Sequence, residues 1–371
     1  MAADSGKKVE YIELIYDLIF VYLIGRSSSL LDRVEAGFIT GETFLNYIVS
    51  SMIILQIWFF TTLYMNWFGE NSVRDKVMIL INMILLYFMG ANTIHGWDIN
   101  YPVYMGAWCM ILLNLSVHYL LQLRTRENPE WRKHILSNAV LLLLQALYIA
   151  GSIPVYLMTQ NTLGPWGFLI GLAALPFITK MPTDFSHLTE RVMLYVIFTF
   201  GDMLLIIAEY FTAGFTFETV YFAVTSVLIV AGLFFSYGYI YDHLIYKSGM
   251  RRCGLYMILH VFIIIALSCI TTALEFMRDS EVRSLPKVVM MVISLLVYYI
   301  GLAMTENWSI RSYVARKRFF PLLLVGFILF AVIMILTVGI NGYLTAGIIL
   351  VFVYVQLFMI RINEKITVQD Q

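Results

Sequence analysis

The stretch TFLNYIVSSMIILQIWFFTTLYMN, residues 43–66, contains no charged side chain. It exceeds the roughly 20 mostly apolar residues that a helix needs to cross the hydrocarbon core of a bilayer. Comparable apolar windows recur along the chain at 11–31, 43–66, 76–95, 102–122, 132–157, 162–180, 188–212, 217–245, 253–276, 286–306, 318–339 and 343–361. These windows predict an all-α fold, a polytopic transmembrane bundle of about 12 spanning helices.

The composition supports this class. The 371 residues are 60% hydrophobic and only 13% charged, whereas soluble chains are about 25% charged. This excludes a soluble enzyme and a disordered protein. The 24 basic and 24 acidic residues cancel, so there is no basic surface to bind nucleic acid.

The sixth window, 162–180, is the weakest. Pro165 is able to begin a helix, but Pro176 would kink or end it, and losing this span would leave eleven. With twelve spans and the N-terminus inside, most basic residues fall in cytoplasmic loops, as the positive-inside rule requires. We therefore expect both termini to be cytoplasmic and the protein to lie in the cell membrane.

A weak internal repeat divides the chain into halves. One shift aligns Gly25 with Gly201 and Phe59 with Phe235. It predicts an N-terminal half at 1–180 and a C-terminal half at 181–371, each of six helices in a parallel 6+6 pseudo-repeat.

Two acids lie within the first window. Glu13 and Asp17 are spaced i, i+4, so they share one helix face about one turn apart. Ionisable groups inside a membrane suggest function by default, and paired carboxylates can bind a proton or cation. The alternative is that Glu13 lies at the interface and pairs with a basic loop.

A basic residue lies deeper in the same window. Arg26 is about 22 Å along a helix that begins at Tyr11. It either extends to the outer interface or, as the repeat suggests, pairs with Asp202 across the central axis.

The seventh window opens with a charged group. His187 and Arg191 share a helix face and Glu190 lies beside them. They form either a structural ion-pair cluster with neighbouring loops or a latch that binds Glu13 or Asp17. In the ninth window, His260 is either a hydrogen-bonded packing residue or part of a proton relay.

Several motifs resemble the bacterial low temperature requirement A (LtrA) family of membrane proteins. The family's E-L-F-F-D-L-V-F-V type motif in helix 1 is similar to Glu13, Leu14, Asp17, Leu18, Phe20 and Val21. Its tryptophan, tyrosine and arginine around helix 2 match Trp58, Tyr64 and Arg74, and a helix 9 histidine matches His260. Its H-x-x-E-R…G-E motif matches His187, Glu190, Arg191 and Gly201, but the final acid here is Asp202. The resemblance implies a membrane protein and no particular activity.

Other helices carry single amides, such as Gln56, Asn82, Asn114, Gln145 and Gln356, which we expect to bond neighbouring helices. Walker, GxSxG and HExxH motifs are missing, so we expect no enzyme, and neither cofactor nor metal. The three cysteines form no CxxC pair.

These observations favour a secondary transporter of a small solute, with a proton as the coupling ion. The alternatives are an ion channel or a lipid-handling protein such as a scramblase, and a membrane-embedded enzyme that uses the buried acids. Expected partners are the lipid bilayer and an unidentified small solute or ion. A second copy of the chain is a further possible partner, because the sequence does not exclude a homo-oligomer.

Overall fold

The computed structural model describes residues 7–91, 93, 100–308 and 312–369. Within these ranges, the chain forms twelve α-helices. Their bounds are α1 Tyr11–Ser28, α2 Gly41–Phe68, α3 Val73–Ala91, α4 Tyr101–Gln122, α5 Pro129–Thr159, α6 Phe168–Ile178, α7 Phe185–Ala208, α8 Phe217–His243, α9 Gly254–Arg278, α10 Ser284–Thr305, α11 Ser312–Leu336 and α12 Gly342–Gln369. Two short antiparallel strand pairs are present: the hairpin of β1 Val34–Glu35 with β2 Phe38–Ile39, and the long-range pair of β3 Thr183–Asp184 with β4 Met250–Arg251. The all-α prediction is confirmed.

Nine of the described helices are long and apolar enough to cross a membrane. Three predicted spans are not among these nine. α3 carries charged residues in its first turn and α6 is short. In α11, Leu323–Leu336 is apolar within the part of the helix whose side chains the structure describes. Residues 92, 94 and 95 of the predicted third window lie outside the described residues.

The shortness of α6 has a local cause. A 3₁₀ turn at Gly164–Gly167, with Pro165 in its first turn, precedes the helix. Pro176 lies inside α6, and the helix ends two residues later at Ile178. Because a proline lacks the N–H of the helical ladder, it favours an early end. The window 162–180 therefore holds only eleven residues of α-helix.

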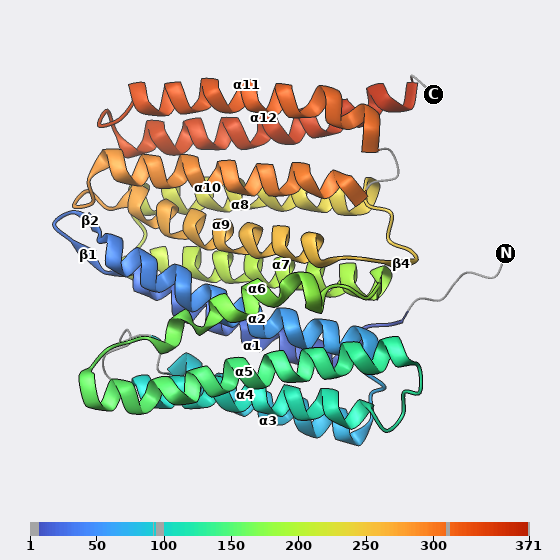
Figure 1. The fold of residues 1–371 in the computed structure, drawn as a ribbon. Helices are drawn as coiled ribbons and strands as arrows, with labels where there is room; N and C mark the ends of the chain where they lie inside the picture. Colours follow the sequence, from blue (N-terminus) through green and yellow to red (C-terminus); the bar gives the residue numbers. More distant parts are fainter. Residues whose placement is uncertain (1–6, 92, 94–99, 309–311, 370–371) are drawn as a thin grey trace. The chain divides into compact units, whose positions relative to one another are not determined.

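The chain divides into two compact units. The first unit comprises Met1–Arg33, Gly41–Tyr195 and Lys247–Ile258. In it, α1 packs against α2 and α3, α4 packs against α3 and α5, and α6 packs against α2 and α5. Figure 1 shows α3, α4 and α5 running alongside one another.

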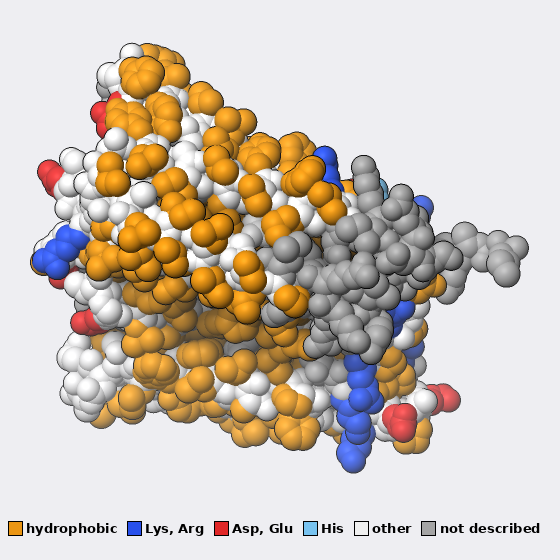
Figure 2. Space-filling view, turned by 90° about the horizontal axis from the view of Figure 1, so that it is seen from above, with side chains coloured by type: hydrophobic (Ala, Val, Ile, Leu, Met, Phe, Trp, Pro, Cys, Tyr) orange, Lys and Arg blue, Asp and Glu red, His pale blue; other side chains and the backbone are white. Residues whose placement is uncertain are grey.

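The second unit comprises Val34–Thr40, Val196–Tyr246 and Leu259–Gln371. Here α12 packs against α8 and α11, and α11 packs against α10. The face in Figure 2 is covered mainly by hydrophobic side chains, and charged side chains lie near its margins. Within the second unit, Val351 and Leu329 are 64% and 61% exposed. Large exposed apolar surfaces are unfavourable in water and match a bilayer.

Candidate functional site

A buried ion pair joins α1 to the first turns of α7, within the first unit. The Arg191 guanidinium donates to both carboxylate oxygens of Asp17, from Nε to Oδ2 at 3.1 Å and from Nη2 to Oδ1. Trp58 of α2 donates from Nε1 to Asp17 Oδ1 at 2.9 Å. Both charged side chains are fully buried. Bidentate pairing of this kind is the geometry that best offsets the cost of burying two charges.

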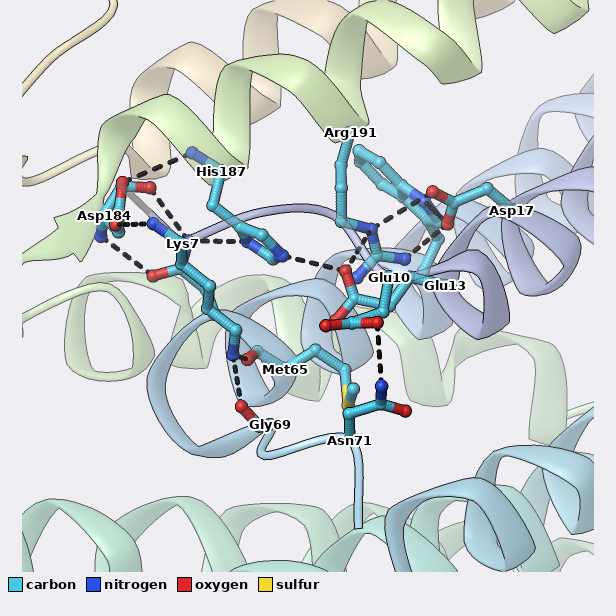
Figure 3. Close-up of polar contacts among 12 residues, drawn as sticks. Lys7, Glu10, Glu13, Asp17, Met65, Gly69, Asn71, Asp184, His187 and Arg191 are labelled. Carbon is cyan, nitrogen blue, oxygen red and sulfur yellow. Dashed lines mark hydrogen bonds and ion pairs between the residues drawn. The ribbon is translucent and has the colours of Figure 1, made fainter. Parts of the chain in front are cut away.

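A second buried pair lies one helical turn earlier. His187 Nε2 is 2.8 Å from Glu13 Oε2, and Arg191 Nε is 3.9 Å from the same oxygen. Figure 3 shows Glu13 and Asp17 on α1 facing His187 and Arg191 on α7. The structure thus brings four of the predicted site residues into one buried cluster.

Asn66 of α2 selects the tautomer of a neutral His187. The Asp184 backbone N–H donates to Asn66 Oδ1 at 2.9 Å, so the other amide atom, Nδ2, is the donor. Nδ2 donates to Asp184 O at 2.9 Å and to His187 Nδ1 at 3.1 Å. Because Nδ1 accepts this bond, the proton of a neutral His187 is on Nε2, which donates it to Glu13.

Asp184 and Lys7 hold the start of α7 in place. Asp184 Oδ1 accepts hydrogen bonds from the N–H groups of Ser186 and His187, at 3.0 and 3.3 Å, and so caps the helix. Its Oδ2 accepts from the Lys7 backbone N–H at 2.9 Å. The Lys7 ammonium donates to the carbonyls of Met65 and Gly69, at the end of α2. Burial lowers the pKa of the Lys7 ammonium, partly opposed by Glu13.

Two polar atoms of the cluster have no hydrogen-bond partner among the described residues: Glu13 Oε1 and Arg191 Nη1. Glu13 is 1% exposed and Arg191 is 0% exposed. The four side chains of α1 and α7 are two carboxylates, one guanidinium and one imidazole. Glu13 Oε1, buried and without a hydrogen-bond partner among the described residues, is able to accept one proton or cation.

The other predicted site residues lie outside this cluster. Glu190 is half-buried and joins none of its ion pairs. Arg26, in the last turn of α1, belongs to the first unit, and Asp202 to the second, so their pairing stays a prediction. His260 is fully buried in the second unit, and its Nε2 is 3.3 Å from the hydroxyl of Tyr237.

Sequence reasoning missed three residues that hold the cluster together. Asn66 contacts His187 directly and Lys7 reaches the cluster only through Asp184, and nothing in their spacing indicates this. Asp184 does have a local signal, since an acid shortly before an apolar helix is a capping pattern.

The amides of the other helices behave as expected, with one exception. Gln145 Nε2 donates to Gln56 Oε1 at 2.6 Å, and Asn114 Nδ2 donates to Asn82 Oδ1 at 2.7 Å, each joining two helices. Gln356 is fully buried, yet neither of its amide atoms has a partner among the described residues. The expectation of an interhelical bond is wrong there.

Among the described residues, nine helices long and apolar enough to cross a membrane are typical of a multi-pass helical membrane protein. Residues 8–354 match the family described as bacterial low temperature requirement A protein (LtrA), and the chain belongs to this family. Comparison with curated proteins and with solved structures gives no match.

Proposed function

We propose that the protein is a secondary transporter of a small solute, that protons drive it, and that Glu13 is the proton-binding group. The observation that carries this proposal is the unpaired Glu13 Oε1 in a buried cluster of two carboxylates, one guanidinium and one imidazole. The proposal includes twelve spans in a 6+6 repeat, location in the cell membrane with both termini cytoplasmic, and no chemical conversion of the solute.

The hydrogen bonds favour Glu13 over His187 as the proton acceptor. The one free ring nitrogen of a neutral His187 would be Nδ1, and Asn66 already donates to it. A second ring proton, on Nδ1, would put an N–H donor of His187 opposite the Nδ2–H donor of Asn66. Glu13 Oε1 has no such competitor, so an arriving proton is best accepted there.

Protonation of Glu13 would loosen the link between α1 and α7. The Nε2–H of His187 then donates to a neutral carboxyl instead of a carboxylate, and such bonds are about half as strong. The attraction between Glu13 and Arg191 across 3.9 Å also disappears, whereas the bidentate pair with Asp17 persists. Because one contact weakens and the other stays, the start of α7 would move relative to α1 when Glu13 takes a proton.

Two cationic side chains, Arg191 and Lys7, act on the Glu13 carboxylate. The Lys7 ammonium is held by two backbone carbonyls outside the span.

The test is solute-driven proton movement in proteoliposomes that contain a trapped pH-sensitive dye. A panel of amino acids, sugars, carboxylates and amines is added outside, one at a time. We expect at least one solute to move protons saturably with the native chain, and Glu13→Gln and His187→Gln to abolish this. The matched controls are Glu130→Gln, which is exposed at the start of α5, and His134→Gln, another buried histidine. Both should keep it.

Three outcomes would overturn the proposal. Proton movement that is ohmic and needs no solute would indicate a channel. Flip of labelled lipids with no response to any solute would indicate lipid handling. Saturable solute uptake that survives Glu13→Gln unchanged would remove Glu13 as the coupling group.

A further inference from the structure

The unpaired amide of Gln356 lies on α12, in the second unit. A primary amide has two N–H donors and one oxygen acceptor, and here neither atom finds a partner among the described residues. Gly326 of α11 is next to it, and a Cβ at that glycine would be 3.0 Å from Gln356 Nε2. A polar group kept in an apolar bundle without a partner is costly and suggests a missing ligand.

A pocket of about 670 Å³ is lined by Gln356, Gly326, Gly347, Phe330, Phe352 and other residues of α8, α11 and α12. Its volume is in the range of pockets that hold small molecules. Exposed apolar side chains, Leu329 and Val351, belong to the same lining. The pocket therefore opens on a surface that faces lipid, and the buried amide lies along its wall.

The depth of Gln356 restricts what this pocket accepts. The first charged residue of α12 is Arg361, so Gln356 lies about 8 Å inside the apolar part of this helix. Phospholipid ester carbonyls lie at the edge of the hydrocarbon core, next to a charged phosphate that would have to follow them inward. Among the described residues that line the pocket, none is charged and able to receive that phosphate.

We infer that the pocket between α8, α11 and α12 binds an uncharged lipid, whose carbonyl or hydroxyl group pairs with the Gln356 amide and whose chain occupies the apolar part. This lipid site does not depend on the proton site at Glu13, and its test requires no transport.

The experiment uses a photoactivatable diacylglycerol with the full-length chain in phosphatidylcholine nanodiscs, and maps crosslinks by mass spectrometry. We expect saturable labelling of α11 and α12 peptides that unlabelled diacylglycerol competes away and added phosphatidylcholine does not. Gln356→Leu should weaken competition about three- to tenfold, the loss expected for one hydrogen bond.

A second variant fills the pocket instead of removing the amide. A Cβ at Gly347 would meet only the Tyr221 hydroxyl, at 3.6 Å, which is ordinary contact. Gly347→Leu should therefore fold and lose the labelling. The control is Gln145→Leu, which removes a buried amide that has partners in the first unit.

Labelling that neither Gly347→Leu nor Gln356→Leu reduces would overturn the assignment. Equal competition by phosphatidylcholine would overturn it too, because the occupant would then be an ordinary bilayer chain. Melting curves of each variant identify any that fail to fold, and the remaining variant decides the result.

Discussion

The bidentate pair between Asp17 and Arg191 makes a strong prediction about stability. Asp17→Asn removes one charge from a pair whose two side chains are fully buried, yet it keeps an acceptor for Trp58 Nε1–H. Arg191 is then left with Glu13, whose nearest oxygen is 3.9 Å away. Removing one partner of a buried pair costs about 3–5 kcal/mol in free energy of unfolding. This is a loss of about two to nearly four orders of magnitude in the folding equilibrium.

A double-mutant cycle separates the pair from its neighbours. Arg191→Met alone should cost a similar amount, because it strands Asp17. The double variant Asp17→Asn/Arg191→Met leaves neither charge stranded, so its cost should be below the sum of the singles by about 1–3 kcal/mol. The assay is reversible unfolding in mixed detergent micelles, followed by circular dichroism.

The control is Glu190→Gln, a half-buried acid on the same helix that joins none of these ion pairs. It should stay within about 1 kcal/mol of the native chain. Additive single variants, or an Asp17→Asn variant as stable as this control, would refute the reasoning.

Three further predictions concern the surroundings of the cluster. Asn66→Ala leaves His187 Nδ1 and the Asp184 backbone without partners, so unfolding free energy should fall by about 1–3 kcal/mol per stranded group, whereas Asn161→Ala in an exposed loop should have no effect in the same assay. Burial lowers the pKa of Lys7 in the folded chain. Between this pKa and the unfolded value of about 10.4, the unfolded chain holds one more proton, so the free energy of unfolding should rise with pH. An equal rise in a Lys7→Met variant would contradict this. Burial raises the pKa of the Cys253 thiol to about 11, so its alkylation, quantified by peptide mass spectrometry, should stay slow from pH 7 to 9 and become fast only on unfolding; rapid alkylation of the folded chain at pH 8 would count against this.

Most helices could be predicted from the sequence because an uninterrupted apolar window leaves the backbone few alternatives in a bilayer. The α2 window at 43–66 lies within the helix Gly41–Phe68. The number of spans was harder to predict. α3 and α6 contain enough apolar residues for a helix, but charged residues at the start of α3 and a proline inside α6 leave each apolar stretch too short for a span.

The cluster was only partly predictable. Helical spacing places Glu13 with Asp17, and His187 with Arg191, on single faces, but it does not say that these faces meet. The role of Asn66 depends on tertiary contact with Asp184, which lies 118 positions away, and no local pattern encodes it. Gln356 could not be predicted for a different reason. Amides in membrane helices usually bond neighbouring helices, and only the three-dimensional packing, in which Gly326 lies next to Gln356 Nε2, shows that this amide has no partner among the described residues.

The most direct test of the central claim is difference infrared spectroscopy of the purified protein during a pH titration. A protonated carboxyl group has a carbonyl band that a carboxylate lacks, so acidification should add such a band. We predict that Glu13→Gln removes part of this band and that Asp17→Asn leaves that part in place. A band that is unchanged in Glu13→Gln would show that Glu13 does not take the proton, and the proposed coupling mechanism would be wrong.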